Sequence, residues 1–187
     1  MKLSNKNISE LLSLCKQNDQ RAQLEIYNRY FKAMFNTAYR IINDKQRAED
    51  IMQESFLNAF SKLDSLKDDN MFGAWLKRIV TNNSLHYYKK YNTNYDVSID
   101  EVLYKVEDET TNGLTEQDNQ KEQVKYILNA LNDLKSNYKI SLTLHLIEGY
   151  DYEEISEIMS ISYANCRTMI SRAKESLRKR LHTQMQV

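Results

Sequence analysis

Glycine and proline, the residues that form most tight turns, are almost missing from this chain: its 187 residues contain three glycines and no proline. Together they make up about a tenth of an average globular protein. β-Hairpins need residues that tolerate positive φ, so this composition argues against sandwiches and barrels. Gly73, Gly113 and Gly149 are isolated from one another, which excludes the glycine-rich loops of Rossmann and P-loop folds. The chain is therefore predicted to be all-α.

Cysteine usage and the N-terminal sequence bear on the cellular compartment. Cys15 and Cys166 are far apart and form no CxxC pair, as expected for thiols in a reducing compartment. The first ten residues are polar, and no apolar run approaches the ~18 residues of a membrane span. We expect a cytoplasmic protein.

Charge is unevenly distributed, although 26 basic and 26 acidic side chains cancel. Residues 1–91 carry 15 basic and 10 acidic side chains, residues 92–133 carry 3 and 10, and residues 134–187 carry 8 and 6. Within 92–120 the helical periodicity lapses, and such a composition buries too little apolar surface to offset its ordering entropy. We predict two small helical domains, 1–91 and 121–187, joined by an acidic linker at 92–120. A plain solvated acidic loop is the alternative.

Apolar residues with a 3.6-residue period predict three helices before the linker, at 24–42, 48–63 and 71–91, with a shorter helix at about 8–17. Three apolar stripes facing one another would form a helix bundle. The expected inward residues are, in turn, Tyr27, Phe31, Met34, Ala38 and Ile41; Ala48, Ile51, Met52, Ser55, Phe56, Ala59 and Leu63; and Phe72, Trp75, Leu76, Ile79 and Val80.

After the linker the sequence predicts a helix-turn-helix. Asp151 and Glu154 have capping-box spacing before a short helix. Residues 160–162 form the turn, and a second helix runs from Tyr163 to about His182. Two apolar stripes precede this unit: Val124, Ile127, Leu128, Leu131 and Leu134, and then Ile140, Leu144 and Ile147.

The second of these helices is strongly basic, with six cations against one glutamate, namely Arg167, Arg172, Lys174, Arg178, Lys179 and Arg180 against Glu175. Cations are favoured at a helix C-terminus, but that reason does not cover Arg167 or Arg172. A basic second helix is typical of a helix-turn-helix that enters the DNA major groove. We therefore interpret this unit as DNA-binding.

No catalytic constellation accompanies these motifs. The histidines His86, His145 and His182 are scattered, and no HExxH, GxSxG or P-loop spacing is present. Neighbouring carboxylates such as Asp68 and Asp69 point to different faces of a helix. We expect no catalytic residue, no metal, no cofactor and no small-molecule substrate.

Taken in order, these motifs resemble the bacterial RNA polymerase sigma factors of the extracytoplasmic-function (ECF, group 4) type, over nearly the whole chain. AEDIMQESFLNAF (48–60) is similar to the region 2.2 helix of that family, and FGAWLKRIVTN (72–82) to region 2.3. IEGYDYEEISEIMSIS (147–162) and RAKESLRKRL (172–181) are similar to region 4. The resemblance implies a protein that directs core RNA polymerase to promoters and melts the −10 element.

The resemblance also implies site residues. Those that would dock on the β′ clamp helices of core polymerase are Asp50, Gln53, Glu54 and Leu57. Those that would contact the −10 region are Asp64, Lys67, Asn70, Asn82, His86, Lys89 and Lys90. Those that would contact the −35 region are Tyr163, Asn165, Arg167, Thr168, Ser171, Arg172 and Lys174. Tyr87 stays open between a base-stacking role and a core position.

Further partners follow from the same resemblance: the polymerase β flap, promoter DNA, and an anti-sigma factor or a recruiting protein. The linker, with eight acidic residues and one lysine at 92–120, would mimic RNA in the polymerase cleft. Departures from the family pattern, such as Met169 in place of an arginine, suggest weak autonomous −35 reading and a recruiting partner. The alternative function is a dimeric helix-turn-helix regulator without sigma activity.

Overall fold

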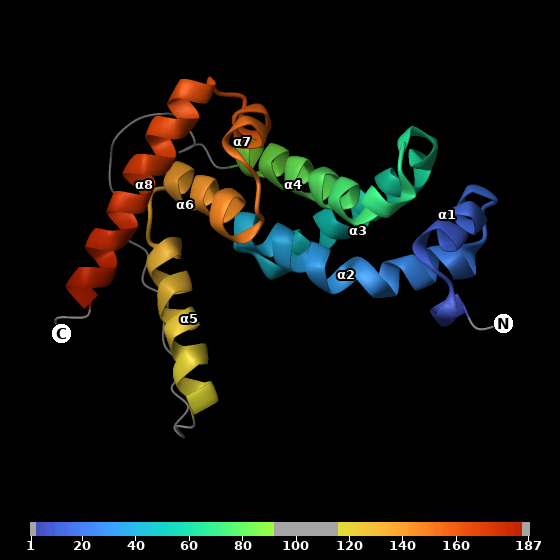
Figure 1. Cartoon of the computed structure of the whole chain (residues 1–187), viewed down its shortest axis with the longest axis horizontal. Coiled ribbons are helices and arrows are strands. Elements are labelled where there is room, and N and C mark those ends of the chain that lie inside the picture. The colour runs from blue at the N-terminus through green and yellow to red at the C-terminus, as the bar shows by residue number, and fades with distance from the viewer. Residues whose placement is uncertain (1–2, 92–115, 185–187) are drawn as a thin grey trace. The chain divides into compact units, whose positions relative to one another are not determined.

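The computed structural model describes residues 3–91 and 116–184 (Figure 1), and all regular structure within these two ranges is helical. The all-α prediction is therefore confirmed. The chain divides into two compact units, with the division between Thr93 and Asn94. Most of the predicted acidic linker lies outside the described residues. No helix in the described ranges is long and apolar enough to cross a membrane.

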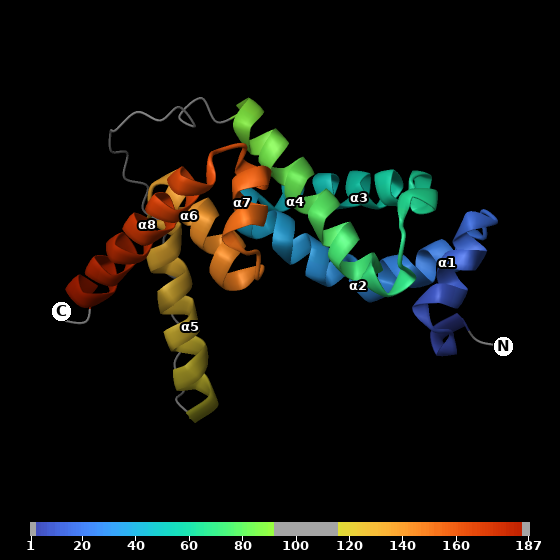
Figure 2. The same cartoon turned by 45° about the horizontal axis from the view of Figure 1, so that its top comes forward.

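The first unit is a bundle of α2 (Gln20–Ile42), α3 (Lys45–Ser61) and α4 (Phe72–Tyr91), with each of these helices contacting the other two. They lie side by side in both views (Figures 1 and 2). The shorter α1 (Ile8–Lys16) packs on α2. Single 3₁₀ turns lie at Leu3–Asn5, Leu63–Ser65 and Asp69–Met71; we call the segment 62–71, between α3 and α4, the α3–α4 loop.

Side-chain caps start these helices in place of proline. The carboxylates of Asp19 and Asp44 accept backbone N–H groups at the first turns of α2 and α3. Asn7 and Glu10 form a reciprocal capping box at α1. Helix α2 ends at Asn43, whose φ of 58° is left-handed, a conformation that asparagine tolerates better than most residues. Polar side chains thus provide the helix boundaries in a chain with little glycine.

The core of the first unit confirms most of the predicted stripes. All seven inward residues predicted for 48–63 are buried, as are Met34, Ala38, Ile41, Phe72, Leu76 and Val80. Phe31 is a correction, because its side chain is 41% exposed. Helix α2 packs against α1, α3 and α4 at once, so its buried arc is rotated toward Ala22 and Ile26, and Phe31 lies at the rim. Tyr27, Trp75 and Ile79 are only partly buried.

The second unit contains α5 (Glu116–Asn132), α6 (Ser136–Leu142), a π-helical turn (Thr143–Ile147), α7 (Tyr152–Met159) and α8 (Tyr163–Gln184). Because α5 begins at Glu116, the last five residues of the expected linker are helical. Within this unit α5 contacts α8 and α6, and its N-terminal half extends away from them (Figure 1).

The apolar stripe of α5 is a second correction. Val124, Ile127 and Leu128 are exposed, Val124 by 56%, whereas Ala130, Leu131 and Leu134 are buried. The helical period alone cannot distinguish a stripe that packs within its own unit from one that is left exposed. Within this unit α5 is fixed at its other side, where the Tyr126 hydroxyl donates to the Leu181 carbonyl at 3.1 Å.

Candidate functional site

One face of α3 presents the four residues expected to dock on polymerase. Asp50, Gln53, Glu54 and Leu57 follow i, i+3, i+4, i+7 spacing and are all exposed, while the opposite face is core. Leu57, at 71% exposed, is the most exposed of the large hydrophobic side chains described. The structure therefore brings these residues together as one apolar side chain beside two carboxylates and an amide. We call this set the α3 face.

Neighbouring side chains leave the α3 face accessible. The Arg47 guanidinium lies 3.7 Å from the Asp50 carboxylate, and both side chains are more than half exposed. The Gln53 amide donates to Glu49 at 3.4 Å. Exposed contacts of this kind contribute little to stability. A partner can therefore replace them at small cost.

Exposed apolar side chains on α2 are a feature that the sequence reasoning missed. Leu24, Phe31 and Tyr39 are exposed, and the rings stack in two pairs, Tyr27 with Phe31 and Phe35 with Tyr39. The signal was present as a second apolar row, since Leu24, Phe31, Phe35 and Tyr39 are spaced by seven, four and four residues. Ring contacts continue from this row to α3, because the Tyr27 ring also contacts the Phe56 ring, and Phe56 contacts Phe60.

The α3–α4 loop carries three of the residues expected at the −10 element. Asp64, Lys67 and Asn70 are all exposed, while Leu63 and Phe72 at the two ends of the loop are buried. The Asp68 carboxylate accepts from the backbone N–H and the side-chain amide of Asn70, at 2.9 and 3.1 Å. The loop is thus fixed at both ends and presents polar groups between them.

The other four −10 residues lie on one face of α4. Asn82, His86 and Lys90 are exposed and Lys89 is half-buried, at i, i+4, i+7, i+8 spacing. With a rise of about 1.5 Å per residue, Asn82 lies roughly 15 Å along the helix from its start at Phe72. The loop and this α4 face are therefore two separate patches of the same unit rather than one cluster.

Tyr87 is half-buried, so its exposure does not decide between a base-stacking role and a core position. Its ring lies 4.5 Å from that of Tyr91, and the Arg47 guanidinium lies 6.0 Å from its centroid. Arg47 therefore contacts both Asp50 of the α3 face and a ring near the end of α4. The Lys90 ammonium lies 5.2 Å from the Tyr91 ring, so rings and cations alternate at this end of α4.

In the second unit, α7 and α8 form the predicted helix-turn-helix. The capping box is present, with the Asp151 carboxylate accepting from the Glu154 N–H at 2.8 Å and Glu154 accepting from the Asp151 N–H at 2.9 Å. Ser160 ends α7 in a left-handed conformation, with φ 58°. The Ser162 hydroxyl accepts from the Asn165 N–H at the start of α8. Local polar side chains thus set both ends of the turn.

Helix α8 divides into a buried and an exposed side. Cys166, Ile170, Ala173 and Leu177 are buried, and burial raises the pKa of the Cys166 thiol. Six of the seven residues expected at the −35 element are exposed, and Lys174, which is half-buried, lies beside the buried side; the six are Tyr163, Asn165, Arg167, Thr168, Ser171 and Arg172. Cys166 is therefore a packing residue, and Met169, half-buried, lies at the border.

Across the described ranges, no three His, Cys, Asp or Glu side chains are grouped so that they could hold a metal ion. The chemistry on offer is that of surfaces. The α3 face is apolar and acidic, the α3–α4 loop is polar, and the exposed sides of α4 and α8 carry the basic side chains, with aromatic rings at the end of α4.

Comparison with known proteins bears on both units. Sigma-70 region 2 matches residues 26–93, and Sigma-70 region 4 matches residues 125–177. The ECF RNA polymerase sigma factor SigW of Bacillus subtilis is 29% identical over 180 residues, which cover 93% of this chain and 96% of SigW. SigM of the same organism is 28% identical over 156 residues, 82% of this chain and 91% of SigM.

Two solved structures share the fold. CnrH, in complex with the cytosolic domain of CnrY, aligns over 94% of this chain and 97% of its own with a TM-score of 0.56 and 19% identity. The sigma factor RpoE of Bartonella quintana, in complex with the anti-sigma factor NepR, aligns over 84% and 95% with a TM-score of 0.55 and 22% identity. With both family regions in order and ECF relatives matching along nearly its whole length, this protein belongs to the extracytoplasmic-function sigma factors of bacterial RNA polymerase.

Proposed function

We propose that this sigma factor docks on the β′ clamp helices of core RNA polymerase through the α3 face. The observation that carries this proposal is Leu57, a large apolar side chain that is 71% exposed beside Asp50 and Glu54. An apolar anchor on the same helix face as two carboxylates suits a partner with a small apolar pocket and basic groups beside it.

Co-purification with core polymerase tests the docking surface. The variant Asp50→Arg/Glu54→Arg reverses two charges on the α3 face and is expected to abolish co-elution, because like charges would then oppose the clamp. The control is Glu153→Arg, a charge reversal at an exposed position of α7 in the second unit, which should still co-elute. Equal co-elution of all three proteins would reject the α3 face as the docking site.

We also propose that the first unit recognises and melts the −10 element. The α3–α4 loop would hold unstacked bases, and the face of α4 with Asn82, His86, Lys89 and Lys90 would follow the displaced strand. Single strands bind where cations alternate with rings on which bases stack, as they do at the end of α4. In holoenzyme, Asn70→Ala is expected to weaken binding of a single-stranded −10 oligonucleotide while leaving core binding unchanged.

The second unit is proposed to read the −35 element through α8, with Arg167 and Arg172 at its exposed side. Each phosphate contact that is lost reduces the slope of log affinity against log salt by about one. Arg167→Ala is therefore expected to flatten the salt dependence of holoenzyme binding to promoter duplex. His182→Ala, on the same helix but outside the proposed contact set, serves as control.

We propose further partners for the second unit and for the linker. The exposed Val124, Ile127 and Leu128 of α5 offer an apolar surface for the polymerase β flap. A known structural neighbour binds an anti-sigma factor, and we propose that such a partner, or a recruiting protein that supplements −35 reading, also controls this chain. The role of residues 92–115 as an RNA mimic in the polymerase cleft remains a proposal outside the described residues.

A further inference from the structure

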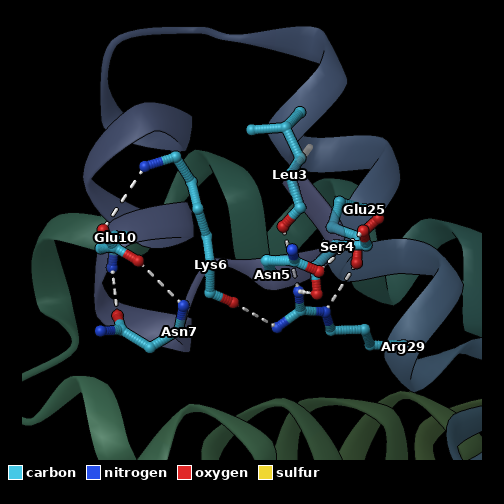
Figure 3. A network of polar contacts seen from close by, with 8 residues as sticks. All are labelled: Leu3, Ser4, Asn5, Lys6, Asn7, Glu10, Glu25 and Arg29. Carbon is cyan, nitrogen blue, oxygen red and sulfur yellow. Dashed lines mark hydrogen bonds and ion pairs between the residues drawn. The ribbon is translucent and has the colours of Figure 1, made fainter. Parts of the chain in front are cut away.

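The Arg29 side chain of α2 binds the stretch Leu3–Lys6, which precedes α1 at the start of the first unit (Figure 3). The Arg29 guanidinium donates to the carbonyls of Lys6, Ser4 and Leu3 at 3.0, 3.1 and 3.2 Å. Its Nε donates to the Glu25 carboxylate at 2.8 Å, which holds the planar group in place. A guanidinium has five donors in a fixed fork and can bind several carbonyls at once, which lysine cannot reproduce.

The captured carbonyls directly precede α1. Asn7 caps this helix, donating its backbone N–H to Glu10 at 3.0 Å and accepting from the Glu10 N–H at 2.9 Å. Lys6 adds an ion pair to Glu10 at 3.4 Å. The four-residue stretch that Arg29 binds therefore continues without a break into the cap of α1, so that Arg29 and the capping box together determine where α1 begins.

Helix α1 in turn packs against the α3–α4 loop. It contacts both 3₁₀ turns of that loop, Leu63–Ser65 and Asp69–Met71, and α1 and the loop lie at the same end of the unit in both views (Figures 1 and 2). Leu11, Leu12 and Cys15 of α1 share one apolar cluster with Leu63, and Leu66 is packed against that cluster.

Apart from α1, the loop contacts α4 through its second 3₁₀ turn, and the Asp68 carboxylate binds Asn70 within it. Between the buried Leu63 and Phe72 it has only two single 3₁₀ turns, and Asp64, Lys67 and Asn70 are exposed. A short segment of this kind holds one conformation only where a rigid surface supports it, and a displacement of about 1 Å in supporting groups is enough to weaken a binding site. In this unit α1 supplies such a surface.

We propose that the segment Leu3–Lys16 positions the α3–α4 loop for capture of −10 bases, and that Arg29 is the positioning residue that locks this segment to α2. Arg29 touches no nucleic acid in this scheme. It acts through α1 on the conformation of the loop. This inference rests on the −10 role proposed above for the loop.

Hydrogen exchange of the full-length protein tests whether Arg29 stabilises the conformation of the α3–α4 loop. In Arg29→Ala, amides of 62–71 should exchange about tenfold faster than in the wild type, since loss of local contacts raises local opening, while the C-terminal half of α4 stays unchanged. Arg29→Lys should lie between the two, because an ammonium can still bind one or two of the carbonyls. Arg21→Ala, at an exposed position on the same helix, should match the wild type. Unchanged exchange of 62–71 in Arg29→Ala would overturn the inference.

Oligonucleotide binding by the holoenzyme tests whether this positioning of the loop contributes to capture of −10 bases. The probe is a single-stranded oligonucleotide selected from a random pool on wild-type holoenzyme. Arg29→Ala should bind it about fivefold more weakly, with core affinity unchanged within twofold. Leu66→Ala removes a loop contact without altering Arg29, and it should likewise weaken oligonucleotide binding while leaving core affinity unchanged. If Arg29→Ala does not fold, Leu66→Ala and Arg29→Lys together test the inference.

The Asn70→Ala variant separates the two proposals. If Asn70→Ala binds the probe as the wild type does, the −10 role of the loop is wrong. If Asn70→Ala weakens binding but Arg29→Ala, Arg29→Lys and Leu66→Ala do not, the loop keeps its role and only the positioning inference is rejected.

Discussion

At the scale of single residues, the shortage of glycine places other side chains in backbone conformations that glycine usually occupies. Asn18, Asn43 and Ser160 have φ values of 62°, 58° and 58°. Asparagine tolerates the left-handed region because its short amide can bond locally, whereas serine does so less readily. Ser160 closes α7 at the turn of the helix-turn-helix, so the second unit contains a strained residue within this motif.

Replacing Ser160 by glycine should relieve that strain. We expect Ser160→Gly to stabilise the second unit by about 0.5 to 1 kcal/mol, the balance between relief of the left-handed penalty and the greater unfolded-state entropy of glycine. Urea denaturation of the full chain, followed by circular dichroism, measures the change. Asn43→Gly is the matched control and should have a smaller effect. A lower unfolding midpoint for Ser160→Gly would contradict the argument.

The two cysteines should be inert in the folded protein. Burial, aided by the nearby Asp19 carboxylate, raises the pKa of Cys15 to about 11, and burial also raises the pKa of Cys166. Below its pKa a thiol is mainly protonated, so at pH 8 only about one Cys15 in a thousand is the reactive thiolate. A chromogenic thiol reagent at pH 8 should react with neither cysteine in native protein and with both in urea. Rapid native reaction of either would show an accessible thiol.

At the scale of elements, α3 shows how one helix serves two surfaces. Its inner side, with Ile51, Met52 and Phe56, belongs to the core, and its outer side is the α3 face. Most helices of this length leave charged residues on the outer side, but here Leu57 is exposed among them. The inner side of α3 therefore stabilises the core, and the outer side is the surface proposed above for polymerase binding.

Two leucines separate these contributions. Leu57→Ala is expected to change the free energy of unfolding by less than about 0.5 kcal/mol and to weaken core polymerase binding by about 1 to 2 kcal/mol. Leu63→Ala, in the α3–α4 loop just after the helix, removes a side chain that is 3% exposed and should destabilise the fold by about 2 to 5 kcal/mol through the cavity it leaves. Denaturation and polymerase titration of both variants provide the comparison. An unstable Leu57→Ala, or one that binds normally, would show that Leu57 has another role.

At the scale of the whole molecule, the chain consists of two units, each with its own core. The two cores draw on different helices: Leu76 and Phe72 belong to the core of the first unit, and Ile170 and Leu144 belong to the core of the second. The chain has a single tryptophan, Trp75, in the first unit. Its fluorescence therefore reports on that unit alone.

This arrangement predicts independent unfolding. Leu76→Ala should lower the unfolding midpoint reported by Trp75 emission, through a cavity worth about 2 to 5 kcal/mol. Ile170→Ala should leave that midpoint unchanged and lower only a transition seen by circular dichroism, because mutations in separate cores do not couple. A shift of the Trp75 transition in Ile170→Ala would show that the two units unfold as one.

By itself the sequence determined the helix content, the helix-turn-helix and the set of exposed candidate residues, because caps and the helical period are local properties. It was sufficient for the capping box of Asp151 and Glu154 and for the whole inner side of α3. Only the tertiary structure decided which apolar stripe is buried. Phe31 and Val124 have the same helical spacing as core residues, yet they are exposed, because burial depends on which neighbouring helix covers a face. Likewise, nothing local in the sequence links Arg29 to Leu3, which is 26 residues away, since that contact exists only once α1 folds back onto α2.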